Sequence, residues 1–333
     1  MNRVGTLLEM GAELCEKQNH AEGIALLEEA ARLDPRNALV QYELGFCYAG
    51  GCGPHARLNP QLAIEHLRVA LRESETCSSP LLRARILSAM GNAYMAATGL
   101  PPTTRLLSAI DCCHESAALY HRHGKPEDRA REQFNEANAW CELPEDAFAE
   151  KWERAIVLYR EALAVRTRHD HPERYAATMH NLGTAYRELK SGNRARNVAR
   201  AIGCYRAALR VRTAAAAPLK NAGLHNNLGN AYVTLAQIDR EHAAKHARRA
   251  LRHFDLALHF YSRTEHPCDY ALTQFNRGHA WLLALSENAE AALRQAAVCF
   301  RQAQECFALC GRTAYSEAAR QRLEQLQPIL SAH

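Results

Sequence analysis

The heptapeptide His-Asn-Leu-Gly-Thr-Ala-Tyr at residues 180–186 returns almost unchanged as Asn-Asn-Leu-Gly-Asn-Ala-Tyr at residues 226–232. Such self-similarity at a separation of 46 residues is the mark of an internal repeat. A small residue equivalent to the glycine of this heptapeptide occurs seven times, at intervals of 34, 46, 46, 46, 46 and 49 residues: Gly11, Gly45, Gly91, Ala137, Gly183, Gly229 and Gly278. The chain of 333 residues is therefore predicted to consist of seven repeats.

Two further patterns keep the same period. A large residue follows each small one three positions later: Leu14, Tyr48, Tyr94, Trp140, Tyr186, Tyr232 and Trp281. A small–large–small set comes after it in each repeat, as in Ala201, Tyr205 and Ala208. Spacings of three and four place residues on one helix face, so each repeat is predicted to be a pair of helices. Periodic prolines suit the first turn of each leading helix: Pro80, Pro126, Pro172, Pro218 and Pro267.

The motif Leu-Gly-x-x-Tyr, followed by Ala-x-x-x-Phe/Tyr-x-x-Ala, resembles the signature of the tetratricopeptide repeat (TPR) over nearly the whole chain. The resemblance implies an all-α fold, a TPR-like α-solenoid in the form of a right-handed superhelix, with seven helix pairs and a C-terminal capping helix. The predicted repeats are residues 1–36, 37–79, 80–125, 126–171, 172–217, 218–266 and 267–313, and the predicted capping helix is 314–333.

The middle repeats are 12 residues longer than the 34-residue first repeat. Gly183 to Ala201 spans 18 residues where Gly11 to Gly23 spans 12. The stretch that leads from the second helix to the next repeat is also six residues longer. We therefore expect both helices of a middle repeat to be about one turn longer, which would deepen the groove between repeats.

Residues 172–186, of the form Pro-x-x-Tyr-Ala-x-Thr-x-x-Asn-Leu-Gly-x-Ala-Tyr, resemble the long repeats of bacterial TPR proteins that carry a caspase-like CHAT protease domain. The arrangement is also similar to kinesin light chains and bacterial peptide-pheromone receptors. No CHAT domain is visible, because after the last repeat residues 314–330 read as a charged amphipathic helix. The resemblance implies, as one alternative, a regulatory subunit of a protease or effector complex.

Composition indicates a cytoplasmic protein. No apolar run approaches the roughly 20 residues that span a bilayer. Glu9, Glu13 and Glu16 interrupt the N-terminal stretch where a signal peptide needs apolar residues. The 12 cysteines stand mostly in helical patterns as small apolar residues, as Cys204 does, which predicts reduced, buried thiols.

The net charge of +5 is unevenly distributed. Residues 1–166 hold 18 Lys and Arg against 23 Asp and Glu, a balance of −5, whereas residues 167–333 hold 23 against 13, a balance of +10. This polarity could steer an acidic partner toward the C-terminal half. The alternative is that these charges form ordinary solvated helix faces.

Asparagine recurs in two columns of the leading helices, which line the concave surface of TPR arrays. It costs roughly 0.5–0.7 kcal/mol relative to Ala in a helix interior, so its recurrence needs a reason. A carboxamide both donates and accepts, and a row of them can pair with the backbone of an extended peptide. The alternative is that one column bridges helices inside the solenoid. The first column stands two positions before the small residue: Asn135, Asn181, Asn227 and Asn276. The second stands one position after it and ends in a histidine: Asn92, Asn138, Asn230 and His279.

Three arginines flank these columns and complete the predicted partner-binding set. Arg85 and Arg131 precede the small residue by six positions, and Arg187 follows it by four. Guanidinium groups there could hold a carboxylate or phosphate with two parallel hydrogen bonds. The alternative is that they belong to the solvated surface.

Catalytic and metal sites are not predicted. Cys47, Cys52 and His55 lie close in sequence, but they lack a fourth ligand and fit no standard zinc spacing. His279 occupies a slot where sister repeats have asparagine, which favours a groove residue over a protease histidine. Without a glycine-rich phosphate loop or paired carboxylates, the sequence predicts no enzyme, no metal and no cofactor.

The predicted function is a non-catalytic protein–protein interaction adaptor that binds a peptide or a partner's segment in its concave groove. A nucleic-acid-binding scaffold is a second alternative, because arginines are dense in the basic C-terminal half. Tyr205 and Phe254 are committed to the core pattern, so bases would lack stacking partners there. A self-assembling structural scaffold is a third alternative. No membrane partner is predicted.

Overall fold

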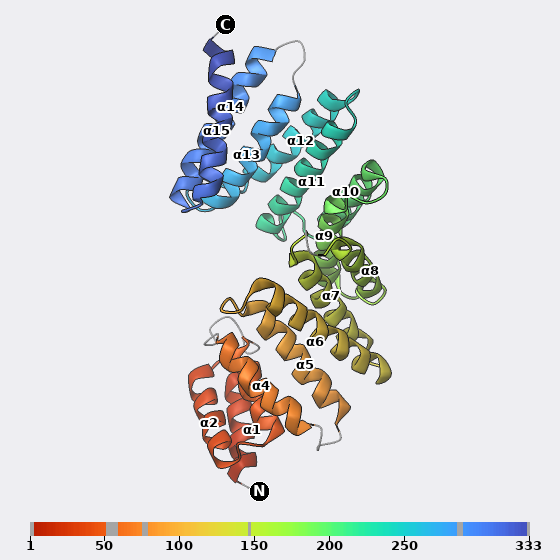
Figure 1. The fold of residues 1–333 in the computed structure, drawn as a ribbon, viewed down its shortest axis with the longest axis vertical. Helices are drawn as coiled ribbons and strands as arrows, with labels where there is room; N and C mark the ends of the chain where they lie inside the picture. The colour runs from red at the N-terminus through yellow and green to blue at the C-terminus, as the bar shows by residue number, and fades with distance from the viewer. Residues whose placement is uncertain (1–2, 51–58, 75–78, 146–147, 285–288, 332–333) are drawn as a thin grey trace. The chain divides into compact units, whose positions relative to one another are not determined.

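The computed structural model describes residues 3–50, 59–74, 79–145, 148–284 and 289–331, and these segments form fifteen α-helices without a β-strand (Figure 1). The predicted all-α solenoid is confirmed. The helices are α1 (Arg3–Glu16), α2 (His20–Leu33), α3 (Ala38–Tyr48), α4 (Pro60–Ser74), α5 (Pro80–Ala96), α6 (Pro102–Arg122), α7 (Pro126–Glu142), α8 (Lys151–Leu163), α9 (Pro172–Glu188), α10 (Arg194–Leu209), α11 (Pro218–Ile238), α12 (Ala243–Leu258), α13 (Pro267–Leu283), α14 (Ala289–Leu309) and α15 (Thr313–Ser331). None of these helices has both the length and the apolarity needed to cross a bilayer.

The chain divides into two compact units, one covering residues 1–166 with α1–α8 and one covering residues 167–333 with α9–α15. Within each unit a leading helix packs against the second helix of its own repeat, as α5 does on α6 and α11 on α12. Each predicted repeat contains one such pair. In the second unit α15 packs against α14.

The two helices of a pair approach each other closely at the periodic small residues. A methyl group placed on Gly183 would lie 2.7 Å from Cε1 of Tyr205, and one on Gly278 would lie 2.7 Å from Cε1 of Phe300. Both aromatic rings are fully buried on the second helix of the same repeat. The small residue therefore admits the large one, which is the packing that the sequence spacing predicts.

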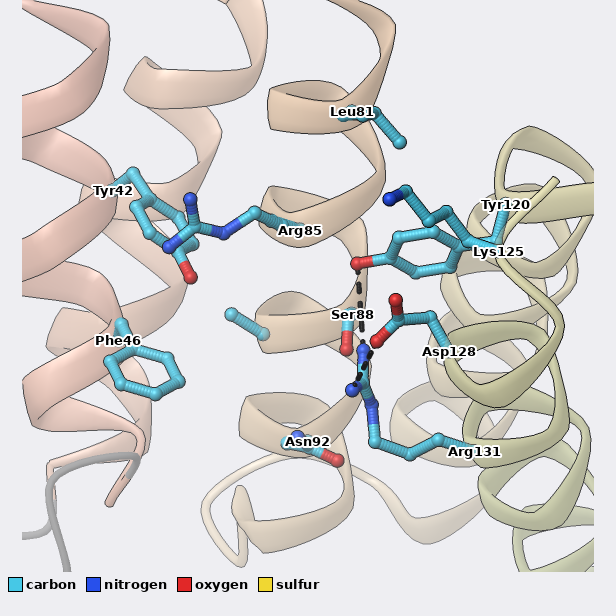
Figure 2. Close-up of a pocket in the computed structure, with 11 residues that line it drawn as sticks. Tyr42, Phe46, Leu81, Arg85, Ser88, Asn92, Tyr120, Lys125, Asp128 and Arg131 are labelled. Carbon is cyan, nitrogen blue, oxygen red and sulfur yellow. Dashed lines mark hydrogen bonds and ion pairs between the residues drawn. The ribbon is translucent and has the colours of Figure 1, made fainter. Parts of the chain in front are cut away.

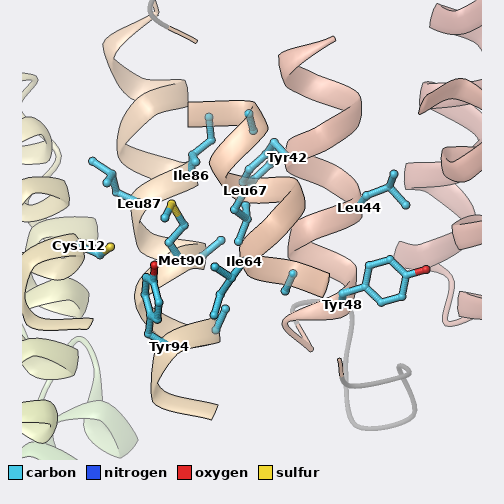
Figure 3. Close-up of a cluster of buried hydrophobic side chains, with 14 of the residues drawn as sticks. Tyr42, Leu44, Tyr48, Ile64, Leu67, Ile86, Leu87, Met90, Tyr94 and Cys112 are labelled. Carbon is cyan, nitrogen blue, oxygen red and sulfur yellow. The ribbon is translucent and has the colours of Figure 1, made fainter. Parts of the chain in front are cut away.

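In the first unit a cluster of buried side chains passes from repeat to repeat, from α1 to the end of α7 (Figure 3 shows part of it). Leu67 of α4 and Ile86 of α5 are fully buried at its centre, and Tyr94 of α5 closes one side. The cysteines behave largely as predicted, since seven of those described are buried and Cys268 is exposed.

Helix lengths follow the sequence prediction on the leading side of the middle pairs and only in part on the other side. The middle leading helices have 17 or 21 residues against 14 in α1, as predicted. Among the second helices of the middle repeats, α6 has 21 residues against the 14 of α2, as predicted. The prediction is wrong for α8, which has only 13 residues, and for α10 and α12, which gain just two.

The extra residues form turns instead. Thr167 Oγ1 accepts a hydrogen bond from the Asp170 amide at 3.0 Å, and Ser262 Oγ accepts one from the Glu265 amide at 3.0 Å. Hydroxyl side chains that bond to nearby backbone amides compete with helix formation. For this reason these second helices end early.

Candidate functional site

A cavity of about 510 Å³ opens between the leading helices of the first unit (Figure 2). It brings together three of the predicted binding residues, Arg85, Asn92 and Arg131. Its walls come from α3, α5, the end of α6 and the start of α7: Tyr42, Phe46, Leu81, Ser88, Ala89, Tyr120, Lys125 and Asp128. The side chains from α5 repeat at spacings of three and four, so they share one helix face.

Arg85 projects into this cavity beside an aromatic wall. Its guanidinium carbon lies 4.8 Å from the centroid of the Tyr42 ring, and Nη2 lies 3.9 Å from a carboxylate oxygen of Glu43. Burial raises the pKa of Glu43, and the nearby Arg85 works against that shift. Stacking uses the flat face of the guanidinium, so its N–H edge remains directed to other acceptors.

Arg131 is held by internal partners. Nη1 donates to Asp128 at 2.7 Å and Nε donates to Glu132 at 2.9 Å. Glu132 is fully buried and also accepts from Ser88 Oγ at 2.8 Å, which ties α7 to α5. Burial raises the pKa of Glu132, opposed by Arg131 and by the Ser88 hydrogen bond. This network forms the polar floor of the cavity and uses much of the donor capacity of Arg131.

Four residues of this site were not predicted from the sequence: Tyr42, Tyr120, Lys125 and Glu132. For Tyr120 a signal was present, since it stands four positions after the second small residue of its repeat. The residues at the same place in the next three repeats are also buried: Arg166, Arg212 and Tyr261. Glu132 also stands at a repeated position, five before the small residue of its leading helix, where five other repeats have fully buried residues: Val40, Ile86, Thr178, Leu224 and Thr273.

The first asparagine column makes contacts between successive leading helices. Asn135 Nδ2 of α7 donates to Asn92 Oδ1 of α5 at 3.3 Å. Asn227 Nδ2 of α11 lies 2.7 Å from His180 Nε2 of α9. Burial, with a smaller contribution from the positive charge of Arg212, lowers the pKa of His180 to about 4, so the neutral ring can accept this bond.

The second column reaches the second helix of its own repeat. Tyr159 OH donates to Asn138 Oδ1 at 2.7 Å, and Thr184 Oγ1 lies 3.2 Å from the hydroxyl of Tyr205. The rings of His279 and Phe300 meet edge to face with centroids 5.1 Å apart. Burial, with a smaller contribution from Arg322, lowers the pKa of His279 to about 4.

The remaining predicted residues lie on the leading helices of the second unit. Asn181, Asn230 and Asn276 are half-buried on α9, α11 and α13. Arg187 is also half-buried on α9, with Nη2 2.7 Å from a carboxylate oxygen of Glu188.

Metal and nucleophile chemistry finds little support in the described segments. Within them no group of three or more His, Cys, Asp or Glu side chains could hold a metal ion. Cys52 and His55 lie outside the described residues. Burial raises the pKa of the Cys112 thiol to about 12, which keeps it protonated and a poor nucleophile.

No protein-family model and no curated protein matches this sequence. Among solved structures, the apo form of RapI is 13% identical over 98% of this chain and 85% of that one, with a TM-score of 0.59. A Rap protein complexed with Competence and Sporulation Factor is 14% identical over 99% and 98%, with a TM-score of 0.46. BtubC (BKLC) from P. vanneervenii is 21% identical over 77% and 93%, with a TM-score of 0.48.

At these identities the likeness concerns the fold. The helix pairs, the Leu-Gly-x-x-Tyr signature at their contacts and the match to RapI agree with one another. The chain has the fold of a TPR-type helical repeat protein.

Proposed function

We propose that this protein is a non-catalytic adaptor that binds an extended segment of a partner protein in the cavity lined by α3, α5 and α7. The observation that carries the proposal is the set of groups facing that cavity. Arg85 and Asn92 come from one helix face, and aromatic rings stand beside them. Backbone groups and a carboxylate of a bound segment would meet the polar groups, while its apolar side chains would contact Tyr42, Phe46 and Leu81.

The charges of the cavity favour an acidic group on that segment. Asp128 is the lining carboxylate, and it is engaged by Arg131. Lys125 is exposed and makes no ion pair within the part of the chain that the structure describes. Arg85, whose contact with the Glu43 carboxylate is long at 3.9 Å, and Lys125 are the cations that would hold a carboxylate of the partner. A few charge-assisted hydrogen bonds with some apolar burial support affinities on the order of micromolar.

The experiment is a selection of random dodecapeptides on the purified full chain, followed by calorimetric titration of the enriched peptides. In the variant Arg85→Gln/Lys125→Gln we expect at least about tenfold weaker binding, which corresponds to about 1.4 kcal/mol. The matched control is Arg122→Gln/Arg160→Gln, which removes the same charge at exposed positions outside the cavity. The control should bind as the wild type does.

Two outcomes would reject the proposal. One is that the folded wild-type chain enriches no peptide sequence. The other is that both double variants weaken binding equally, because the effect would then come from net charge and not from this cavity. Circular dichroism shows whether each variant retains its helices.

A further inference from the structure

A second cavity, of about 660 Å³, lies in the second unit on the side formed by the second helices α10 and α12. Three arginines line it, Arg206 from α10 with Arg249 and Arg252 from α12, and all three are exposed. No carboxylate is among its lining residues. Such a cluster of positive charge attracts an anionic ligand, and binding of the ligand would reduce the repulsion among the arginines.

Tyr232 of α11 holds two of these arginines in place. Arg206 Nη2 donates to the Tyr232 hydroxyl at 2.8 Å, and the Arg249 guanidinium carbon lies 5.8 Å from the ring centroid. The imidazole of His253 stacks on the same ring, with centroids 5.6 Å apart and an interplanar angle of 6°. Guanidinium groups from two helices are thus oriented around one buried phenol before any ligand arrives.

The charge of this cluster is not compensated within the described residues, where Arg206, Arg249 and Arg252 form no ion pair. Asp255 of α12 is not available to them, because its carboxylate pairs with Arg277 Nε at 3.0 Å. His253 adds no charge near neutral pH, since burial, the neighbouring His225 and the arginines lower its pKa to about 4.

We propose that this cavity binds an acidic segment of a partner protein. Carboxylates of the segment would lie against the three guanidinium groups, and an apolar side chain beside them would contact Ile202, Leu235 and Leu256. Leu256 is 42% exposed, so its side chain can supply the apolar contact.

The lining argues against a nucleic acid as occupant. Single-stranded nucleic acids bind where aromatic faces are open for bases to stack. Tyr232 is only 4% exposed, and its ring is already in contact with His253 and Arg249. A phosphate backbone offers no apolar side chain to the apolar lining residues. An acidic peptide, in contrast, can carry both carboxylates and apolar side chains.

The test uses a fluorescein-labelled nonapeptide, Glu-Glu-Leu repeated three times, and fluorescence polarisation with the full chain at about 50 mM salt, where screening is weak. We expect the wild type to bind it and Arg206→Gln/Arg249→Gln/Arg252→Gln to bind at least about tenfold more weakly. The matched control, Arg196→Gln/Arg210→Gln/Arg248→Gln, removes three exposed arginines of the same basic unit outside the cavity. Its affinity should stay within about threefold of the wild type.

A single-residue variant keeps the proposal testable if the triple variant does not fold. Arg252 makes no hydrogen bond or ion pair within the described segments, so Arg252→Glu removes no internal contact of that kind. It should weaken the peptide at least about tenfold by charge reversal.

Equal weakening by both triple variants would overturn the proposal, as would failure of the wild type to bind the peptide. The same holds if a labelled oligothymidylate binds this cavity and the peptide does not. None of these results bears on the cavity between α3, α5 and α7, whose residues are unchanged in all the variants.

Discussion

At the scale of single residues, two glycines of the same repeat differ in whether packing requires them. Gly183 on α9 faces the Tyr205 ring, which is fully buried and whose hydroxyl lies 3.2 Å from Thr184 Oγ1, so the ring cannot move aside. Gly203 on α10 has no neighbouring atom within 4 Å of an added methyl group. Only the first glycine is required by packing.

Gly183→Ala should destabilise the protein by about 1–3 kcal/mol through overpacking. Gly203→Ala should stabilise it by about 0.5–1 kcal/mol, because alanine reduces the entropy of the unfolded chain and favours helix. Thermal denaturation followed by circular dichroism should show melting temperatures that move in opposite directions. A shift of the same sign in both variants would contradict this interpretation.

The lowered pKa of His180, about 4 against the ordinary 6.5, makes stability depend on pH. Above pH 6.5 the ring is neutral in both the folded and the unfolded chain and contributes no pH dependence. Between pH 6.5 and 4 the unfolded chain binds the proton more readily, so stability falls as the pH falls. Below about 4 the ring is protonated in both states and the loss levels off.

His180→Gln should therefore flatten the decline in melting temperature between pH 7 and pH 4.5, because glutamine does not titrate. The slope of melting temperature against pH is the quantity to compare, since the substitution also changes the bond to Asn227. An unchanged slope would show that this ring is not the titrating group.

At the scale of elements, a side chain early in the second helix satisfies the carbonyl groups that end the leading helix. Lys151 of α8 is buried, and Nζ donates to the carbonyls of Cys141, at 3.1 Å, and Leu143. Arg105 of α6 likewise donates to the Met95 carbonyl at 2.7 Å. Each capping residue stands four positions before the first small residue of its second helix.

Lys151→Met should cost about 1–3 kcal/mol, because the alkyl part of the side chain is kept while charged hydrogen bonds to buried carbonyls are lost. Lys17→Met is the matched control, since Lys17 is 67% exposed and its ion pair is with Glu13, one helical turn away. That change should cost less than about 0.5 kcal/mol. Equal losses in chemical denaturation would argue that Lys151 does not act as a cap.

At the scale of the whole molecule, the two compact units carry net charges of opposite sign. Residues 1–166, the first unit, carry −5, and residues 167–333, the second unit, carry +10. Both proposed sites contain arginines, but within the described residues only those of the acidic unit pair with carboxylates: Arg131 with Asp128 and Glu132, and Arg85 with Glu43 at 3.9 Å.

The end of the second unit depends on α15, which covers the apolar face of α14. Leu326 is 5% exposed and packs in a cluster with Ala296 and Phe300. Leu326→Asp should destabilise the protein by roughly 3 kcal/mol or more, because an unpaired charge would be buried. The exposed face of α14 should then cause self-association.

Size-exclusion chromatography with light scattering, together with the melting temperature, measures both effects. Gln325→Asp places the same residue one position earlier, where the side chain is exposed. It should leave the protein unchanged to within about 0.5 kcal/mol. If Leu326→Asp behaves like this control, α15 does not protect the end of the solenoid.

Only part of the candidate site could be predicted from the sequence. Arg85 and Asn92 were predicted from their positions relative to the small residue of the repeat, and the structure places both in the lining of one cavity. That Arg131 is engaged by Asp128 and Glu132 was not predicted, because such pairing depends on burial, and Ser88 meets Glu132 across 44 residues of chain. The early end of α8 was not predicted either. A turn closed by a hydroxyl side chain and one more helical turn occupy the same number of residues, so the length of the repeat does not distinguish them.

The sequence by itself determined the number of repeats, the pairing of helices and the residues at their contacts. These follow from local periodicity, since the geometry of the α-helix converts spacings of three and four into a face. Only the tertiary structure decided which polar groups are used internally and which face an open cavity. That outcome depends on distances between side chains from different helices, and no local pattern along the chain encodes those distances.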